Sequence, residues 1–409
     1  MFDLSSERLL ENEERFAPRN GHRFVEIWEC GDARPPIYRS GDLKEKEIAS
    51  WIHEERSANG PIQSGLRVLL CPKPAGKPSS GKLPFSQETF RQLSQAWRIP
   101  STFLRAIAQK LSVVTRCSVA PVCSVGMERS AASLPNSPRS PRHRVATFSS
   151  LPASPVKERV EEEGILDDRK SSISDSATCL LVRGDVDWTW DYTMLLIHDP
   201  AAHMTYAIVV GLTAIEIDLI QSYLSSPAIT GSSLSTHPIL LPVLLLDLAT
   251  DETASLLKIR IKLLSQIQQQ TGMDRFNSLR SANVSGRTSI GGREKERHEL
   301  DLDAVMLRLT CLSDWVAAQR GFVSIQQRVV GVIEEMLCSV PQSPGTSPAA
   351  YVKTQFTERL SFISQSLYAA EQKCQYLERS ISAQVQTIYS LIGQKDNRLN
   401  IALQARLVR

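Results

Sequence analysis

The sequence predicts an α+β protein, in which a mixed α/β domain is followed by long coiled-coil-like helices and is interrupted by a disordered insertion. Two observations predict the first two parts. Strand-like and helix-like stretches alternate up to about residue 250, and every regular stretch after Asp251 has helical spacing. The third observation is compositional, since residues 133–155 are rich in Ser, Pro and Arg and hold almost no large apolar side chains.

Composition narrows the class of protein. The 409 residues suit two or three units, and an apolar content of 42% is enough for a real core. The net charge of +3 gives no reason to expect a nucleic-acid partner. Eight scattered cysteines without a C-x-x-C pair indicate reduced thiols in a cytoplasmic protein. The most apolar run, 238–249, is too short to cross a membrane, so the sequence as written predicts no transmembrane segment.

Residues 1–115 are predicted to form the first half of the α/β domain. Phe24–Trp28 and Leu66–Leu70 have the alternation and apolar character of strands. Residues 44–56 are expected to form a short charged helix. Two further helices are expected over 86–97 and 101–111, separated by a proline at position 100.

Residues 116–177 are predicted to be a disordered Ser/Pro/Arg-rich insertion, because such a composition cannot bury enough apolar area to offset the entropy of ordering. Ser137, Ser140 and Ser154 each precede a proline close to arginines. They are candidate sites of proline-directed phosphorylation, and the alternative is an unmodified linker.

Residues 178–250 are predicted to complete the domain with strands at 179–183, 189–198 and 204–210 and a helix at 214–224. His198, Asp199 and His203 share one hairpin loop. Two imidazoles and a carboxylate can bind a transition metal, and the alternative is ordinary polar loop chemistry.

From residue 251 onward the pattern is helical, with a loop at 277–293 inside the region 251–338 and a last helix over 349–409. At 1.5 Å per residue the last helix is about 90 Å long, about three times the width of a small domain. Its apolar residues alternate in steps of three and four, which is typical of coiled coils and predicts a homo-oligomer through the long helices. We call the following residues of this pattern the stalk seam: Leu360, Ile363, Leu367, Leu377, Ile381, Val385, Ile388 and Ile392.

The sequence does not predict an enzyme or a bound cofactor, since it holds no recognisable Ser/His/Asp, Cys/His or paired-carboxylate arrangement. Asp247 and Asp251 are four residues apart, with Glu252 adjacent, so on one helical face they could share a hard cation such as Mg²⁺. The alternative is an acidic cap at the start of a helix.

The order of these parts resembles the soluble region of the CorA-like magnesium and divalent-cation transporters, in particular their fungal members. Four stretches carry the resemblance: 86–90 (SQETF), 188–196 (WTWDYTMLL), 237–242 (HPILLP) and 389–401 (YSLIGQKDNRLNI). In that family a stretch similar to the last one lies on the stalk helix shortly before the first membrane span. The resemblance implies a funnel-and-stalk fold, pentamers, and regulatory Mg²⁺ held by acidic residues between subunits, for which Asp247 and Asp251 are the candidates.

The sequence departs from the family where the pore should be. Both membrane spans and the Gly-Met-Asn signature are missing from the 409 residues. We therefore expect the cytosolic domain of a transporter-family protein, truncated or pore-less and without conduction of its own, which lies at the cytosolic face of a membrane if the full-length protein has the spans. The alternative function is a soluble coiled-coil oligomerisation or scaffold protein.

Overall fold

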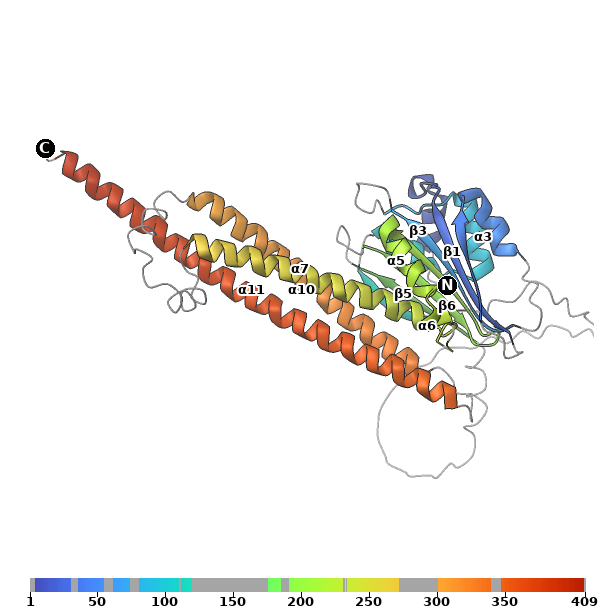
Figure 1. The fold of residues 1–409 in the computed structure, drawn as a ribbon. Coiled ribbons are helices and arrows are strands. Elements are labelled where there is room, and N and C mark those ends of the chain that lie inside the picture. Colours follow the sequence, from blue (N-terminus) through green and yellow to red (C-terminus); the bar gives the residue numbers. More distant parts are fainter. Residues whose placement is uncertain are drawn as a thin grey trace, which may run out of the picture.

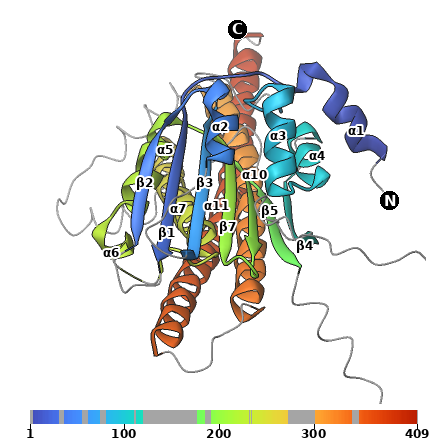
Figure 2. The same cartoon turned by 90° about the vertical axis from the view of Figure 1, so that its right-hand side faces the viewer.

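In the computed structural model, seven strands form one mixed sheet in the order β2-β1-β3-β7-β6-β5-β4 (Figure 2). The structure describes residues 4–30, 36–54, 62–73, 81–109, 112–119, 176–184, 191–230, 232, 234–271, 301–339 and 347–407. The strands are β1 (His22–Cys30), β2 (Ile37–Leu43), β3 (Ile62–Pro72), β4 (Val113–Val119), β5 (Ala177–Arg183), β6 (Thr193–Asp199) and β7 (Met204–Leu212). Every neighbouring pair is antiparallel except β3 and β7, which are parallel.

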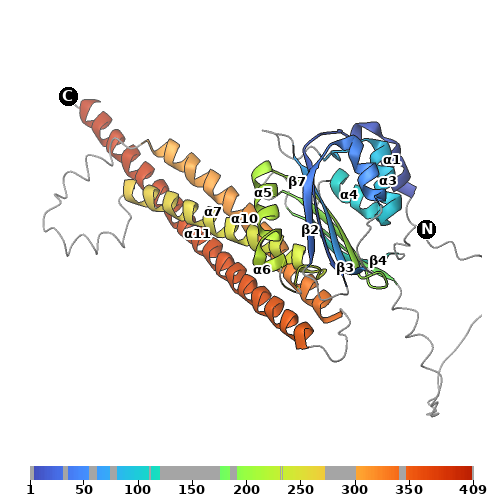
Figure 3. The same cartoon turned by 45° about the vertical axis from the view of Figure 1, so that its right-hand side comes forward.

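Short helices cover one face of the sheet (Figure 3). They are α1 (Leu4–Glu11), α2 (Ile48–His53), α3 (Gln87–Trp97) and α4 (Ser101–Gln109), with 3-10 turns at Glu13–Arg15 and Glu45–Glu47. The Ser86 hydroxyl accepts a hydrogen bond from the Thr89 amide and so caps α3. Phe90, Leu93 and Phe103 from these helices pack against the buried sheet residues Leu69 and Ile197.

The remaining helices cover the opposite face of the sheet. They begin with α5 (Ala214–Leu224) and α6 (Pro227–Thr230), where Thr213 and Glu216 form a capping box at the start of α5. The three-helix bundle follows, made of α7 (Leu240–Gln270), α10 (Leu302–Ser339) and α11 (Ser347–Leu407). Figure 1 shows α7 and α10 leaving the sheet alongside α11, so the core of the bundle continues the core beneath the sheet. The predicted fold class, a mixed α/β domain followed by long helices, is confirmed.

Several element bounds differ from the prediction. The first bundle helix begins at Leu240 rather than at Asp251, because Pro242 lies in its first turn, where a missing N–H costs nothing. Residues 116–119 belong to β4 and residue 177 opens β5, so the insertion predicted over 116–177 is shorter at both ends. Its remainder, 120–175, and the loop predicted at 277–293 lie outside the described residues.

A buried ion pair joins the sheet to the helices of the first face. Glu26 on β1 lies directly opposite Arg67 on β3, and the Arg67 Nε donates to Glu26 Oε1 at 3.0 Å. The Arg67 guanidinium also donates to the Trp51 and Ile52 carbonyls at the end of α2, and it lies 4.6 Å from the centre of the Trp51 ring. One buried cation is thus held by a carboxylate, two carbonyls and an aromatic face.

We predict that Glu26→Gln lowers the free energy of unfolding by about 3–5 kcal/mol, because it leaves the Arg67 cation buried without its counter-charge. Denaturant titration followed by circular dichroism measures this loss. Glu47→Gln is the matched control, since the Lys44–Glu47 pair is exposed and its loss is expected to cost at most about 1 kcal/mol. Equal effects of the two substitutions would contradict the prediction.

Candidate functional site

The two predicted magnesium ligands lie on α7 in different surroundings. Asp247 is half-buried and forms an ion pair with Arg359 of α11, whereas Asp251 is exposed one helical turn further along. A cation at Asp247 competes with the Arg359 guanidinium, a contact that no local pattern in the sequence indicates. Among the described residues, no group of three or more His, Cys, Asp or Glu side chains is placed to hold a metal ion. The assignment of Asp247 and Asp251 stays a prediction.

The three residues His198, Asp199 and His203 take part in the β6–β7 turn itself. The Asp199 carboxylate accepts hydrogen bonds from the amides of Ala201 and Ala202, at 3.0 and 3.3 Å. His198 Nδ1 lies 3.0 Å from the Thr205 hydroxyl, and His203 takes the left-handed backbone conformation, with φ of 50°. These contacts suit a polar turn, the alternative that the sequence left open.

A further histidine, His237, lies near His198 at the junction between the sheet domain and the bundle. It precedes α7, and its ring lies 4.8 Å from the Phe356 ring of α11. The pKa of His237 is lowered to about 4, mainly by burial and to a smaller extent by the nearby His198. Burial also lowers the pKa of His198 to about 4, against the opposing effect of the Asp199 carboxylate. Both rings are therefore neutral at neutral pH.

The stalk seam is buried inside this chain. Six of its residues are fully buried, and Val385 and Ile392 are partly buried against the same core. The six are Leu360, Ile363, Leu367, Leu377, Ile381 and Ile388. Their partners are α7 and α10, so the three-four spacing of α11 serves an intramolecular bundle over this length.

Beyond the seam, α11 continues past the ends of α7 and α10 (Figure 1). Every residue from Gly393 to Leu407 is exposed, and we call this segment the projecting end. Leu399, Leu403 and Leu407 are 55%, 56% and 85% exposed and recur every four residues, so they lie along one side of the helix. Leu399, Leu403 and Leu407 thus repeat the apolar spacing of the seam on an exposed side of the helix.

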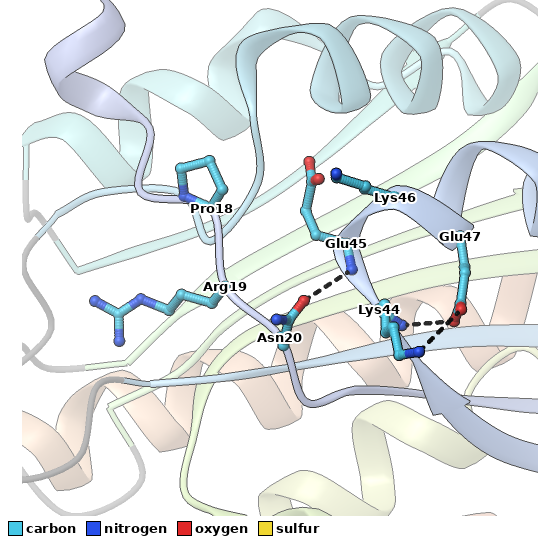
Figure 4. A pocket seen from close by; sticks show the side chains of 7 residues that line it. All are labelled: Pro18, Arg19, Asn20, Lys44, Glu45, Lys46 and Glu47. Carbon is cyan, nitrogen blue, oxygen red and sulfur yellow. Dashed lines mark hydrogen bonds and ion pairs between the residues drawn. The ribbon is translucent and has the colours of Figure 1, made fainter.

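An open pocket of about 480 Å³ lies beside the 3-10 turn that precedes α2 (Figure 4). It is lined by Pro18, Arg19, Asn20, Lys44, Glu45, Lys46 and Glu47. Its acidic residues are already engaged, because Glu47 pairs with Lys44 and Glu45 accepts hydrogen bonds from Ser86 and Thr89. Figure 4 shows Arg19 pointing away from the two lysines, so the cations do not converge on a common ligand.

Three predicted phosphorylation sites, Ser137, Ser140 and Ser154, lie outside the described residues. Within the described part of the chain, no helix combines the length and the apolar character that a membrane crossing requires.

Comparison with known proteins gives likenesses to solved structures. No protein-family model matches the chain, and no curated protein matches its sequence at a significant level. The structure is similar to a solved structure described as that of the full-length CmaX protein, with a TM-score of 0.46 and 8% sequence identity. The alignment covers 94% of this chain and 82% of that chain. A likeness of this size assigns neither a family nor a function.

We predict that acid destabilises the protein through His198 and His237. Their folded pKa of about 4 lies below the usual histidine pKa of 6.5, so the unfolded state binds more protons between these values. The stability is fully present above pH 6.5 and falls by about 1.4 kcal/mol per pH unit for each histidine as the pH drops toward 4. Below pH 4 these two groups cause no further loss.

The measurement is the slope of the unfolding free energy against pH. His22, whose pKa burial also lowers, adds to the slope of the unsubstituted protein. The variant His237→Gln is therefore compared with it directly, and its slope is expected to be shallower by about the contribution of one proton. An unchanged slope would show that His237 has the same pKa in the folded and the unfolded state, which contradicts the prediction.

Proposed function

We propose that this chain is the cytosolic domain of a CorA-like divalent metal ion (Mg²⁺) transporter-family protein, and that these residues do not conduct ions themselves. The observation that carries the proposal is the projecting end of α11, which includes residues 393–401 of the stretch 389–401 that resembles the family's stalk before its first membrane span. The order of a sheet domain, a three-helix bundle and one helix that outreaches the bundle supports it.

The proposal includes self-association, with a second copy of this chain as the partner of α11. The apolar line of Leu399, Leu403 and Leu407 continues the spacing of the stalk seam, and an isolated helix of about fifteen residues is marginal in water. Further up the helix, Phe362, Tyr368, Tyr376 and Tyr389 are each about half exposed or more. Aromatic residues are enriched at the centre of protein interfaces, where association buries side chains that are exposed in the free chain.

We predict that the double variant Leu399→Asp/Leu403→Asp weakens self-association at least tenfold, because it places two carboxylates in the expected helix–helix contact. Sedimentation velocity across a range of protein concentrations measures this, and circular dichroism checks that the helix content is kept. Gln394→Asp/Asn397→Asp is the matched control, since it adds the same charge on the opposite side of the same helix. If the unsubstituted protein is monomeric at every concentration, the proposed self-association is wrong.

The proposal also includes regulatory Mg²⁺ at Asp247 and Asp251. Because Arg359 occupies the Asp247 carboxylate, Arg359→Gln is expected to tighten Mg²⁺ binding, and Asp251→Asn to weaken it, each by severalfold. Isothermal titration at millimolar Mg²⁺ measures both. Arg320→Gln is the control, since it breaks a similar exposed pair with Glu378 away from the aspartates. The absence of Mg²⁺ binding, or equal behaviour of the two arginine variants, would count against sensing.

The second candidate function is a soluble coiled-coil scaffold protein. The same exposed residues of the projecting end favour it, because they suit a partner helix without any membrane. Sequencing the transcript through the codon for Arg409 separates the two. Two further apolar stretches of about 20 residues with Gly-Met-Asn between them support the transporter, and a stop codon supports the scaffold.

A further inference from the structure

Two cysteines that are distant in sequence face each other on neighbouring strands. Cys117 on the edge strand β4 is the direct partner of Cys179 on β5 in the antiparallel register. Residues opposed in this way have Cα atoms about 4.5–5.5 Å apart, and disulfides join Cα atoms roughly 4.4–6.8 Å apart. The two thiols already share a hydrogen bond, so their sulfur atoms are in contact. The backbone of this pair therefore matches a disulfide without rearrangement.

The two thiols differ in exposure and in acidity. Cys117 is half-buried at the edge of the sheet, whereas Cys179 is fully buried among the residues beneath α3 and α4. The hydrogen bond from Cys179 lowers the pKa of Cys117 to about 7, and the same contact raises the pKa of Cys179. The pair therefore loses its first proton more readily than an isolated thiol, and the half-buried Cys117 is the sulfur that a reagent reaches first.

Two other buried cysteines have the opposite character. Burial raises the pKa of the Cys71 thiol well above its usual value, and burial raises the pKa of Cys374 to about 11. Both remain protonated at neutral pH, and protonated buried thiols are inert. The contrast sets the cross-strand pair apart from cysteines that only fill the core.

We propose that Cys117 and Cys179 form an oxidisable dithiol, which a hydroperoxide such as hydrogen peroxide converts into a disulfide. The Cys117 thiolate attacks one peroxide oxygen, the O–O bond breaks, and the second oxygen leaves as hydroxide and takes up a proton to become water. Cys117 is then a sulfenic acid. The Cys179 sulfur attacks the Cys117 sulfur as its proton departs, the S–S bond forms, and the S–O bond breaks to release a second water. Two electrons pass from the two thiols to the peroxide.

The position of the pair gives the bond a structural effect. Arg116, next to Cys117, donates a hydrogen bond of 2.8 Å to the Ser339 hydroxyl at the end of α10, and β4 packs along α10. A disulfide fastens this edge strand to β5 and so holds the contact between the sheet and the bundle. It also closes the chain between residues 117 and 179 into a covalent loop, which restricts the unfolded state. Cytosolic disulfides are usually transient, so a dithiol reductant is expected to reverse the bond.

The test treats the full chain with hydrogen peroxide at pH 7, blocks the remaining thiols by alkylation, and maps the peptides by mass spectrometry without reduction. Cys123 lies outside the described residues and is replaced by serine so that it cannot exchange with the pair. We expect a peptide linked through Cys117 and Cys179 as the main product. We also expect a Tm several degrees above that of the reduced protein, and reversal of both by dithiothreitol.

Two variants make the outcome specific. Cys179→Ser removes the second thiol, so the sulfenic acid on Cys117 should persist and react with dimedone. Cys311→Ser removes an exposed cysteine on α10 and should leave the linked peptide unchanged. The proposal is overturned if Cys117 and Cys179 are recovered separately alkylated while Cys311 or Cys338 is oxidised, or if Cys117 links to a second chain instead. The linked peptide is mapped in the protein that carries only the Cys123→Ser replacement, so a failure of Cys179→Ser or Cys311→Ser to fold does not affect this result.

Discussion

The parallel contact between β3 and β7 is the constraint on which the rest of the architecture depends. Strands β2, β1 and β3 form one antiparallel half of the sheet, strands β7, β6, β5 and β4 form the other, and these two central strands alone join the halves. A side chain at Gly65, where the pairing starts, would place its Cβ 2.6 Å from the Met204 sulfur. β3 also supplies both cores, since Val68 and Leu70 face the bundle and Leu69 faces the short helices. Loss of this contact would therefore divide the sheet and both layers that cover it.

The bundle extends from that sheet as one continuous core. Leu245 on α7, Val209 on β7 and Leu360 on α11 belong to the same buried cluster, so the long helices are not a separate unit joined by a linker. The length of α11 then creates an imbalance. It has 61 residues, whereas α7 has 31 and α10 has 38. The apolar pattern of α11 therefore extends beyond the ends of the two helices that it packs against (Figure 1). This imbalance is why the same spacing fills a core as far as Ile392 and is exposed from there to Leu407.

Elements with strong local patterns could be predicted from the sequence, and elements defined by long-range contacts could not. The three-four spacing of α11 located the buried residues from Leu360 to Ile392, because one helix face must be apolar to be buried. Strand β2 was missed because its side chains alternate weakly and most are exposed. The Cys117–Cys179 pair spans the whole insertion, and only the register of β4 on β5 brings the two residues together. The Asp247–Arg359 pair is equally non-local, so the spacing of the aspartates could suggest a cation site without revealing its competitor.

Polar side chains inside the bundle explain why its helices keep one register. Thr271 at the end of α7 donates to Gln384 of α11 at 3.0 Å, and near the sheet Arg359 of α11 pairs with Asp247 of α7. The Thr271–Gln384 contact is buried and disfavours sliding, because any shift leaves a desolvated group without its partner. The more exposed Arg359–Asp247 pair adds a second contact near the sheet. α7 and α11 are thus tied at both ends of their contact. A charge change at Asp247 alters its ion pair with Arg359, which lies on α11, the helix that carries the projecting end. This pair is the contact through which the cation binding that we propose at Asp247 would reach the projecting end.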